Sequence, residues 1–259
     1  MLSPIEQLDR AKTFHRLHVK GDPIVLFNVW DAGTARVVAG AGAKAIATGS
    51  WSVAAAQGCS DGQVLPLAVA LDNLARIVAS VTLPATIDLE AGYGDAPEVV
   101  AETVARAITA GAIGCNLEDQ IIGGDGLYSI DDQSRRIRAA RQAADRANLP
   151  IFINARTDLF LKTATERHDD RLVDYALQRA QSYADAGASG IFVPGLVDER
   201  LIGRMCTASP LPVNIMVLPA VPTAKRLAEL GVTRISHGPG PYVQMMQSLD
   251  EAARRVYAT

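Results

Sequence analysis

The segment Leu83-Pro84-Ala85-Thr86-Ile87-Asp88-Leu89-Glu90-Ala91-Gly92-Tyr93-Gly94 joins an apolar run to two carboxylates and two glycines. Its first five residues are typical of a buried strand. Because residues i and i+2 of a strand point to the same face, Asp88 and Glu90 would converge. Two like charges there repel each other unless a cation or a proton compensates them. Gly92 and Gly94 allow a sharp turn or a close approach to a ligand. The segment therefore predicts either an ordinary acidic turn or an acid site at a strand end.

Short apolar runs of the same kind recur along the whole chain. They lie at 23–29, 45–48, 85–88, 113–117, 151–154, 190–193, 213–217 and 234–237. Helical patterns separate most of them, for example at 98–110, 134–147, 171–186 and 223–230. Apolar strands that alternate with amphipathic helices predict a parallel sheet covered by helices.

A repeated turn indicates one repeating unit. Ala-Gly-Ala stands between a helix and the next strand at 41–43, 110–112 and 186–188, where glycine is the expected helix C-cap. The chain has 259 residues and lacks a Pro/Gly/Ser-rich linker, and an α/β barrel needs about 250 residues. We predict a single α/β-barrel domain over residues 1–259, a (β/α)8 barrel of the TIM type with a helix at each end. A doubly wound sheet with two extra strands is the alternative.

Composition excludes several classes of protein. Hydrophobic residues make up 49% and charged residues 20%, which indicates a large core. The net charge is −3 without a Lys/Arg cluster, so neither nucleic acid nor a membrane is an expected partner. The apolar runs are too short for a transmembrane helix, and the first residues do not resemble a signal peptide. Three widely spaced cysteines (Cys59, Cys115, Cys206) without a CxxC pair predict a cytoplasmic protein.

The carboxyl ends of the predicted strands are polar and acidic, whereas the opposite ends are plain turns. Functional groups of a (β/α)8 barrel come from the carboxyl ends, so this asymmetry indicates an enzyme. The residues concerned are Thr48, Gly49, Ser50, Asp88, Glu90, Glu118, Asp119, Asn154, Arg156, Asp158, Asn214, Ser236 and His237.

The residue types at these ends suggest a particular chemistry. Asp88, Glu90 and Glu118 are hard oxygen ligands of the kind that suits Mg²⁺ or Mn²⁺. Arg156 is placed to receive a carboxylate or phosphate in a bidentate fork. The 48–52 turn offers hydroxyls and backbone N–H groups for an oxyanion. Together they describe a site for a metal-bound enolate or 2-oxo acid.

Several longer motifs resemble one superfamily. The chain is similar to the isocitrate lyase/phosphoenolpyruvate mutase superfamily, in particular to its shorter bacterial PEP-mutase-like members. The match runs in order from about residue 20 to about residue 240 and is strongest in D-x-[DE]-x-G-Y-G at 88–94 and x-[LI]-E-D at 116–119. Other matching segments are Asn28-Val29-Trp30-Asp31-Ala32, Thr48-Gly49-Ser50-Trp51, Gly58-Cys59-Ser60-Asp61-Gly62, Asn154-Ala155-Arg156-Thr157-Asp158, Phe192-Val193-Pro194-Gly195 and Pro212-Val213-Asn214-Ile215-Met216.

The resemblance implies a metal site and a substrate site. It implies that Asp88 binds Mg²⁺ directly and that the ion is also held, partly through water, by Asp61, Glu90 and Glu118. The backbone N–H groups of Ser50 and Trp51 would grip a pyruvyl oxygen and carboxylate, and Arg156 would bind a substrate carboxylate or phosphonate. The resemblance further implies a homo-oligomer, a dimer or tetramer, in which the last helix (241–257) is exchanged between subunits.

The loop that follows Asp119 departs from the superfamily. Lyases that cleave isocitrate or methylisocitrate carry a Lys-Lys/Arg-Cys-Gly-His motif there, whereas residues 120–128 contain no Cys, His or Lys. The Lys, Thr and Asn of the mutase and phosphonate hydrolase loops are also missing. The protein is therefore not expected to be an isocitrate lyase.

Other residues are assigned individually. Candidates for catalysis are Arg156, Glu118, Tyr93 and His237, with Tyr128 as a further possible lid acid, and Asn214 is a candidate for substrate binding. We expect Cys115 to be a buried thiol. His15 and His18, and the helical arginines Arg135, Arg136, Arg138 and Arg141, are expected at the surface.

Three functions remain open. The first is a Mg²⁺-dependent enzyme that makes or breaks a C–C bond in a small 2-oxo or 2-hydroxy (di)carboxylic acid through an enolate-like intermediate, as a lyase or a decarboxylase. The second is a C–P mutase or hydrolase of the phosphonopyruvate type. The third is a non-catalytic carboxylic-acid binder.

Overall fold

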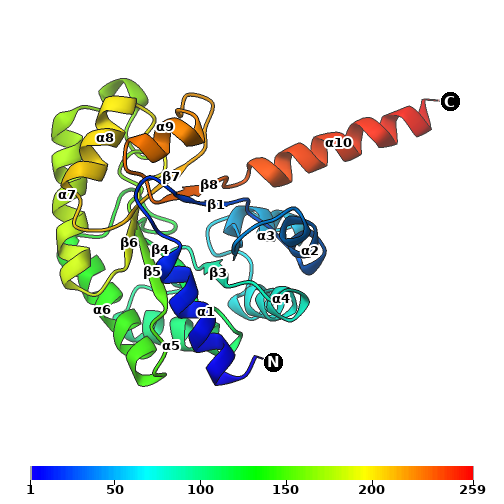
Figure 1. Cartoon of the computed structure of the whole chain (residues 1–259), viewed down its shortest axis with the longest axis horizontal. Coiled ribbons are helices and arrows are strands. Elements are labelled where there is room, and N and C mark those ends of the chain that lie inside the picture. The colour runs from blue at the N-terminus through cyan, green and yellow to red at the C-terminus, as the bar shows by residue number, and fades with distance from the viewer. Residues whose placement is uncertain (1, 259) are drawn as a thin grey trace.

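Parallel strands form the centre of the molecule (Figure 1). The structure is a computed structural model and describes residues 2–258. Within these residues there are eight strands, all parallel, in the order β1-β8-β7-β6-β5-β4-β3-β2. Their bounds are β1 (Ile24–Leu26), β2 (Ile46–Ala47), β3 (Ala85–Asp88), β4 (Gly114–Glu118), β5 (Phe152–Arg156), β6 (Gly190–Phe192), β7 (Val213–Met216) and β8 (Arg234–Ser236). The predicted (β/α)8 barrel is confirmed, and all eight strands lie where the apolar runs predicted them.

The barrel closes between β1 and β2 just beyond the ends of both strands. The N–H of Val29 donates to the carbonyl of Ala47 over 2.9 Å, and Val29 bridges to Thr48. The buried side chain of Asn28 donates to the Thr48 carbonyl (3.1 Å) and accepts from the N–H groups of His237 and Gly238. Asn28 therefore joins the chain segments after β1, β2 and β8 at the mouth of the barrel.

Helices surround the strands, as the sequence predicted. They are α2 (Ala32–Gly40), α3 (Ser50–Ala56), α4 (Leu67–Ser80), α5 (Pro97–Thr109), α6 (Ile130–Arg146), α7 (Asp170–Asp185), α8 (Glu199–Ala208) and α9 (Ala224–Glu229). Gly111 and Gly187 have φ near +100° after α5 and α7, which explains the glycine of the Ala-Gly-Ala turns. One local difference is that the expected 48–52 turn already enters a helix at Ser50, because Gly49 is extended and serves as the N-cap of α3.

Helix α1 (Pro4–Arg16) covers the amino-terminal end of the barrel. The His18 ring, just past its end, stacks on Phe152 of β5 with ring centroids 3.9 Å apart, and Phe14 of the helix is fully buried beside it. Burial and the charge of Arg234 lower the pKa of His18 to about 3. The expectation that His18 lies at the surface is wrong, because this aromatic group is needed to close the bottom of the core.

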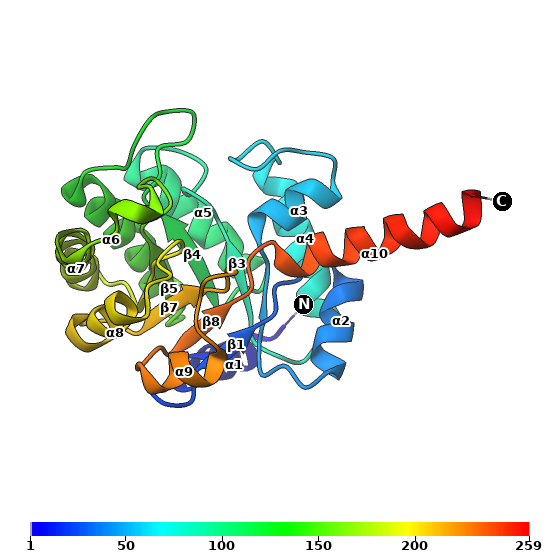
Figure 2. The same ribbon diagram turned by 90° about the horizontal axis from the view of Figure 1, so that it is seen from above.

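Helix α10 (Gly240–Tyr257) projects away from the barrel in both views (Figures 1 and 2). Among its described residues only Pro241 is buried, while apolar side chains such as Met245, Met246 and Leu249 are exposed. No helix in the part of the chain that the structure describes has both the length and the hydropathy needed to cross a membrane.

Candidate active site

The acidic side chains predicted for the strand ends gather at the mouth of the barrel. Asp88 ends β3, and one of its carboxylate oxygens accepts a hydrogen bond from the Ser50 hydroxyl over 3.2 Å. A small pocket of about 10 Å³ lies beside it, with Ser50, Asp88, Glu90 and Tyr93 in its wall. The structure therefore brings these four predicted residues together around one small space.

Glu90 holds the loop that carries Asp61. One Glu90 carboxylate oxygen accepts from the backbone N–H groups of Gly62 (2.8 Å) and Gln63 (2.7 Å). Gln63, Glu90 and Tyr93 have φ values of 62°, 50° and 60°, in the left-handed region that non-glycine residues rarely adopt. Strained backbone of this kind is concentrated at functional sites. The conformation of the loops that carry Gln63 and Glu90 therefore supports a functional role for this region.

The acids are close enough to perturb one another. Burial, with the charges of Asp61 and Asp88, raises the pKa of Glu90 to about 7. The pKa of Asp61 is raised by partial desolvation and by the charge of Asp88. Burial and the three carboxylates also raise the pKa of Tyr93, so its phenol keeps its proton at neutral pH. Negative charge is thus crowded at this mouth, as the two-carboxylate motif predicted.

A pH dependence of stability follows from Glu90. Because its pKa is higher in the folded than in the unfolded protein, the folded state binds more protons between about pH 4.5 and pH 7, and stability falls as the pH rises through that window. The raised pKa corresponds to up to about 3 kcal/mol. Urea unfolding at pH 5 and pH 7.5 should show this loss, and Glu90→Gln, which keeps an oxygen for Gly62 and Gln63, should reduce it, while Asp61 and Glu118, whose pKa values are also raised, account for the remainder. An equal pH dependence in the variant would refute this assignment.

Arg156 is brought to the same mouth but is already paired with protein carboxylates. Its Nη1 lies 3.0 Å from Glu118, while its Nε and Nη2 donate to the fully buried Asp158 over 2.5 and 3.1 Å. Burial raises the pKa of Glu118 well above its usual value, and the charge of Arg156 opposes that rise. A substrate carboxylate would therefore meet the N–H groups of Arg156 that these acids leave available, in a guanidinium orientation fixed by Asp158.

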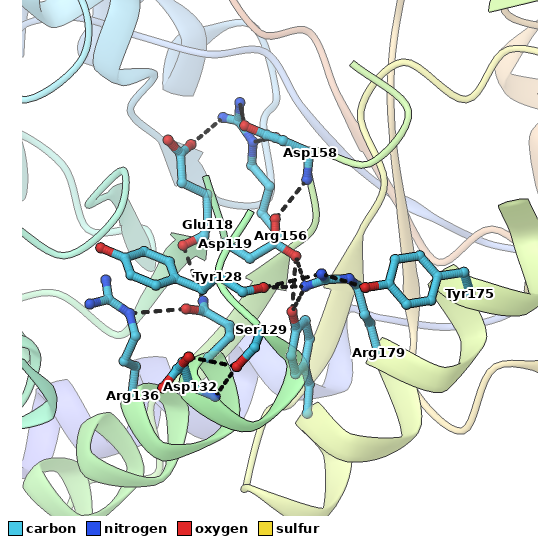
Figure 3. A network of polar contacts seen from close by, with 12 residues as sticks. Glu118, Asp119, Tyr128, Ser129, Asp132, Arg136, Arg156, Asp158, Tyr175 and Arg179 are labelled. Atoms are coloured by element: carbon cyan, nitrogen blue, oxygen red, sulfur yellow. Dashed lines mark hydrogen bonds and ion pairs between the residues drawn. The ribbon is translucent and has the colours of Figure 1, made fainter. Parts of the chain in front are cut away.

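Asp119 fixes the position of Asp158, the partner of Arg156, through buried hydrogen bonds (Figure 3). One of its oxygens accepts from the backbone N–H of Asp158 (3.0 Å), and the other accepts from Arg179 Nη1 (2.8 Å) and the Tyr183 hydroxyl (2.9 Å). Arg179 also donates to the carbonyl of Tyr128. The same buried network thus holds Asp158, helix α7 and the end of the loop that follows β4.

Arg136 corrects an expectation from the sequence. It was expected to be solvated, but it is 1% exposed and donates to the carbonyls of Ala91, Gly94 and Asp95. Its Nε donates to Gln133, whose side chain donates to the carbonyl of Glu118. Arg136 therefore ties the turn after Glu90 to the end of β4.

The burial of Arg136 was partly predictable from its position on the helix. Arg136 lies among Gln133, Ile137 and Ala140 at the three- and four-residue spacing of one buried helix face. Arg141 is also not simply solvated, since it donates to the carbonyls of Gly187 and Ile151.

The loop at 120–128 forms a small closed turn. Gln120 bridges to Leu127, and the N–H of Tyr128 donates to the Asp119 carbonyl over 2.8 Å. The Tyr128 hydroxyl donates to Asp95, and the Arg136 guanidinium lies 4.1 Å from the centre of its ring. Burial and Asp95 raise the pKa of Tyr128 to about 12. Tyr128 fastens the loop to the turn after β3, which leaves its hydroxyl engaged rather than free as a lid acid.

Three predicted residues are not in contact with the acids. The exposed Trp51 ring packs against Tyr242 of α10, with centroids 5.8 Å apart. The half-buried His237 ring packs against Phe27, at 5.1 Å, and burial lowers its pKa. Asn214 is buried inside the barrel, where it accepts from the Ser236 hydroxyl over 3.1 Å. Their proposed roles stay predictions.

One polar residue of the pocket was missed from the sequence. Asn73 lies on α4, lines the pocket beside Asp88 and donates to the Trp30 carbonyl over 2.9 Å. A polar residue next to the buried positions Ala70 and Leu74 was the available signal. The amphipathic pattern of the helix masks it, because an isolated polar residue there is ordinarily solvated.

Comparisons with known proteins identify the family of the chain. The sequence profile of the phosphoenolpyruvate phosphomutase family matches residues 14–257. The 2-methylisocitrate lyase of Escherichia coli is 30% identical over 222 residues, 82% of this chain and 72% of that protein. The oxaloacetate decarboxylase of Pseudomonas entomophila is 28% identical over 256 residues, 95% of this chain and 84% of that protein.

A solved structure shows the same fold over the full length. It is a Burkholderia cenocepacia protein with the provisional designation of phosphonomutase, 55% identical, with a TM-score of 0.94 over 98% of this chain and 100% of that one. The match to the family profile covers almost the whole chain and includes every acidic residue of the mouth. The chain therefore belongs to the phosphoenolpyruvate phosphomutase family, within the isocitrate lyase/phosphoenolpyruvate mutase superfamily that its motifs resemble.

Proposed function

We propose that this protein is a Mg²⁺- or Mn²⁺-dependent enzyme that makes or breaks a C–C bond in a small 2-oxo or 2-hydroxy (di)carboxylic acid through an enolate-like intermediate. The observation that carries the proposal is the small pocket beside Asp88, which has crowded carboxylates and the Ser50 hydroxyl in its wall. Relatives named as a lyase and a decarboxylase of such acids support the same class of reaction.

The acid set fits a cation that keeps much of its water. Within residues 2–258, no group of three or more Asp, Glu, His or Cys side chains lies close enough together to hold a metal ion without other ligands. Glu90 and Glu118 each have an oxygen engaged by a protein group, whereas Asp88 accepts only hydrogen bonds of 3.2 Å or longer, so Asp88 is our candidate for the direct ligand. Mg²⁺ is usually bound by one or two carboxylates and retains several waters, whereas a Zn²⁺ site needs three or four protein ligands. The donor set therefore favours Mg²⁺ or Mn²⁺.

The chain's own residues would orient the substrate and handle charge and protons. When bound, the cation would supply Lewis-acid polarisation of the substrate oxygen. The backbone N–H groups at the start of α3 would stabilise negative charge that develops on that oxygen, while the Ser50 hydroxyl donates to Asp88. Arg156 would orient the distal carboxylate. Tyr93 lines the pocket with its proton retained, so it is our candidate for the group that returns a proton to the enolate carbon.

A substrate panel tests the proposal. The protein with Mg²⁺ would be given oxaloacetate, alkylmalates, isocitrate, 2-methylisocitrate and phosphonopyruvate, with release of 2-oxo acid and of phosphate measured separately. We expect 2-oxo acid from at least one C–C substrate and none from isocitrate. If oxalate binds tightly while no compound is turned over, the non-catalytic binder replaces this proposal.

The C–P alternative has one observation in its favour, the designation of the 55% identical structure as a phosphonomutase. Loop 120–128 counts against it, since the residues associated with that chemistry are missing. Phosphate release from phosphonopyruvate, or its conversion to phosphoenolpyruvate, would favour the alternative in the same panel.

We further propose a homo-oligomer that buries α10, and a cytoplasmic location in keeping with the free thiols of Cys115 and Cys206. The projecting helix exposes Met245 and Leu249, four residues apart on one face. On the barrel, the outward side chains of Val25 and Phe27 are exposed beside a groove between β1 and α2. The helix of a second copy would cover this apolar groove.

The oligomer prediction concerns mass in solution. Met245→Glu/Leu249→Glu should reduce the oligomer to smaller species, because each carboxylate would have to be buried without a partner. Light scattering after size-exclusion chromatography measures this change. Gln247→Glu, on the opposite side of the helix, is the matched control and should leave the mass unchanged. A monomeric wild-type protein would contradict the proposal.

A further inference from the structure

A single arginine occupies the interior of the barrel. Arg234, on β8, is 1% exposed, and its guanidinium lies 5.9 Å from the centre of the Phe14 ring. None of the ion pairs found among residues 2–258 includes it. Burying a charge without an ion-pair partner costs free energy. We therefore expect a more distant negative charge to offset part of that cost for Arg234.

The immediate neighbours of Arg234 are neutral. Its Nη2 donates to Asn116 Oδ1 over 3.3 Å, and the same oxygen accepts from Asn154 over 2.9 Å. Its Nε and Nη1 have no protein acceptor. Its strand neighbour on β7 is Asn214. Hydrogen bonds to amides orient the guanidinium but leave its charge uncompensated.

Asp88, at the mouth, is the acidic residue whose charge acts on Arg234. Asn116, which accepts from Arg234, pairs in register with Asp88 on the neighbouring strand. The guanidinium therefore reaches across the barrel to the strand next to Asp88. Burial lowers the pKa of Arg234 to about 10, against an opposing effect of the Asp88 charge, so the group stays protonated at neutral pH.

We propose that Arg234 is a positioning residue whose permanent charge balances the acids around Asp88 and thereby sets their affinity for a divalent cation. The inference rests on the proposed function, because it concerns the same cation. Charges interact strongly across a protein interior, where the effective dielectric constant is about 20. Arg234 should therefore weaken binding of a bare cation and favour the cation together with an anionic substrate, whose charge offsets its own.

Two substitutions separate charge from hydrogen bonding. Arg234→Gln removes the charge but keeps an N–H donor for Asn116, whereas Arg234→Lys keeps the charge. Calorimetric titration of the full chain with Mg²⁺ and Mn²⁺ at pH 8 should show about tenfold tighter binding by the Gln variant. The Lys variant should stay within about twofold of the wild type. A merely structural role predicts the opposite sign, because a damaged site binds its cation more weakly.

A second variant covers the case in which Arg234→Gln does not fold. Asn116→Asp places a carboxylate within hydrogen-bond distance of Arg234 and neutralises it in place, so cation binding should again tighten. Lys12→Gln, which removes an exposed positive charge on α1, is the control and should change nothing. Folding is checked by circular dichroism.

The outcomes separate the two proposals. If the wild type binds cations but a folded Arg234→Gln or Asn116→Asp variant binds them equally or more weakly, the inference about Arg234 fails alone. If the wild type binds neither cation, the proposed function fails, and the role of Arg234 fails with it.

Discussion

Asp88→Asn is expected to abolish measurable cation binding and to lower turnover of the productive acid by at least about a thousandfold, roughly 4 kcal/mol of transition-state stabilisation. Asp88 faces the pocket without an ion-pair partner, and its oxygens accept hydrogen bonds of 3.2 Å from the Ser50 hydroxyl and from the Glu90 backbone N–H. Glu90 and Glu118 each use one carboxylate oxygen to hold the Asp61 loop and Arg156, so neither is expected to take over its role fully. Release of 2-oxo acid and calorimetric Mg²⁺ titration measure the two effects.

The stability of the same variant distinguishes loss of function from loss of fold. Asp88 lies between like charges and the positive charges of Arg156 and Arg234, whose effects oppose one another, so its neutralisation should change the melting temperature little. Asp9→Asn, an exposed position on α1, is the matched control for removal of one carboxylate. Cation affinity within about threefold of the wild type in Asp88→Asn would overturn the assignment of Asp88 as the direct ligand.

The fold was predictable because its signals are local. An apolar run followed by an amphipathic helix specifies one βα unit from nearby residues alone, and even the two-residue strand β2 lies within the predicted 45–48 run. The convergence of Asp88, Glu90 and Ser50 then followed from the barrel, since the ends of neighbouring parallel strands meet at one edge. This part of the site needed only the order of the motifs.

Side-chain pairing was not predictable in the same way. Arg156 appeared free to bind a substrate, yet its guanidinium is shared by Glu118 and Asp158. Arg136 appeared solvated, yet it is buried against the turn at 91–95. Arg156 and Asp158 are only two residues apart, but the other pairings join elements that are distant in sequence, which periodicity does not report. The conformation of loop 120–128 was not predictable either, because Arg179 and Asp95, which hold the loop by hydrogen bonds, lie on other elements.

The second large effect is expected at that anchor. Arg179→Met should destabilise the protein by about 3–5 kcal/mol, the usual cost of removing one partner of a buried ion pair. Asp119 is fully buried and Arg179 is 2% exposed, so Asp119 would lose the one charged partner that it has among residues 2–258. Chemical unfolding measures the loss, which corresponds to a fall in melting temperature of roughly 10 °C for a chain of this size.

An exposed ion pair provides the control. Arg204 of α8 pairs with Asp174 of α7 at the surface, so Arg204→Met should cost less than about 1 kcal/mol. The double variant Asp119→Asn/Arg179→Met should recover part of the stability, because it no longer buries an unpaired charge. If Arg179→Met costs as little as Arg204→Met, the network in Figure 3 does not carry the stability assigned to it.

The pH dependence of this loss connects the network to the active site. Burial raises the pKa of Asp119 even with Arg179 beside it. Without Arg179 the carboxyl group would take up a proton more readily, so Arg179→Met should lose more stability at pH 8 than at pH 5. Asp119 also accepts from the N–H of Asp158, whose carboxylate orients Arg156. The variant should therefore raise KM for the carboxylate substrate more than it lowers kcat, because Arg156 would lose its fixed orientation while Asp88 and Ser50 keep theirs.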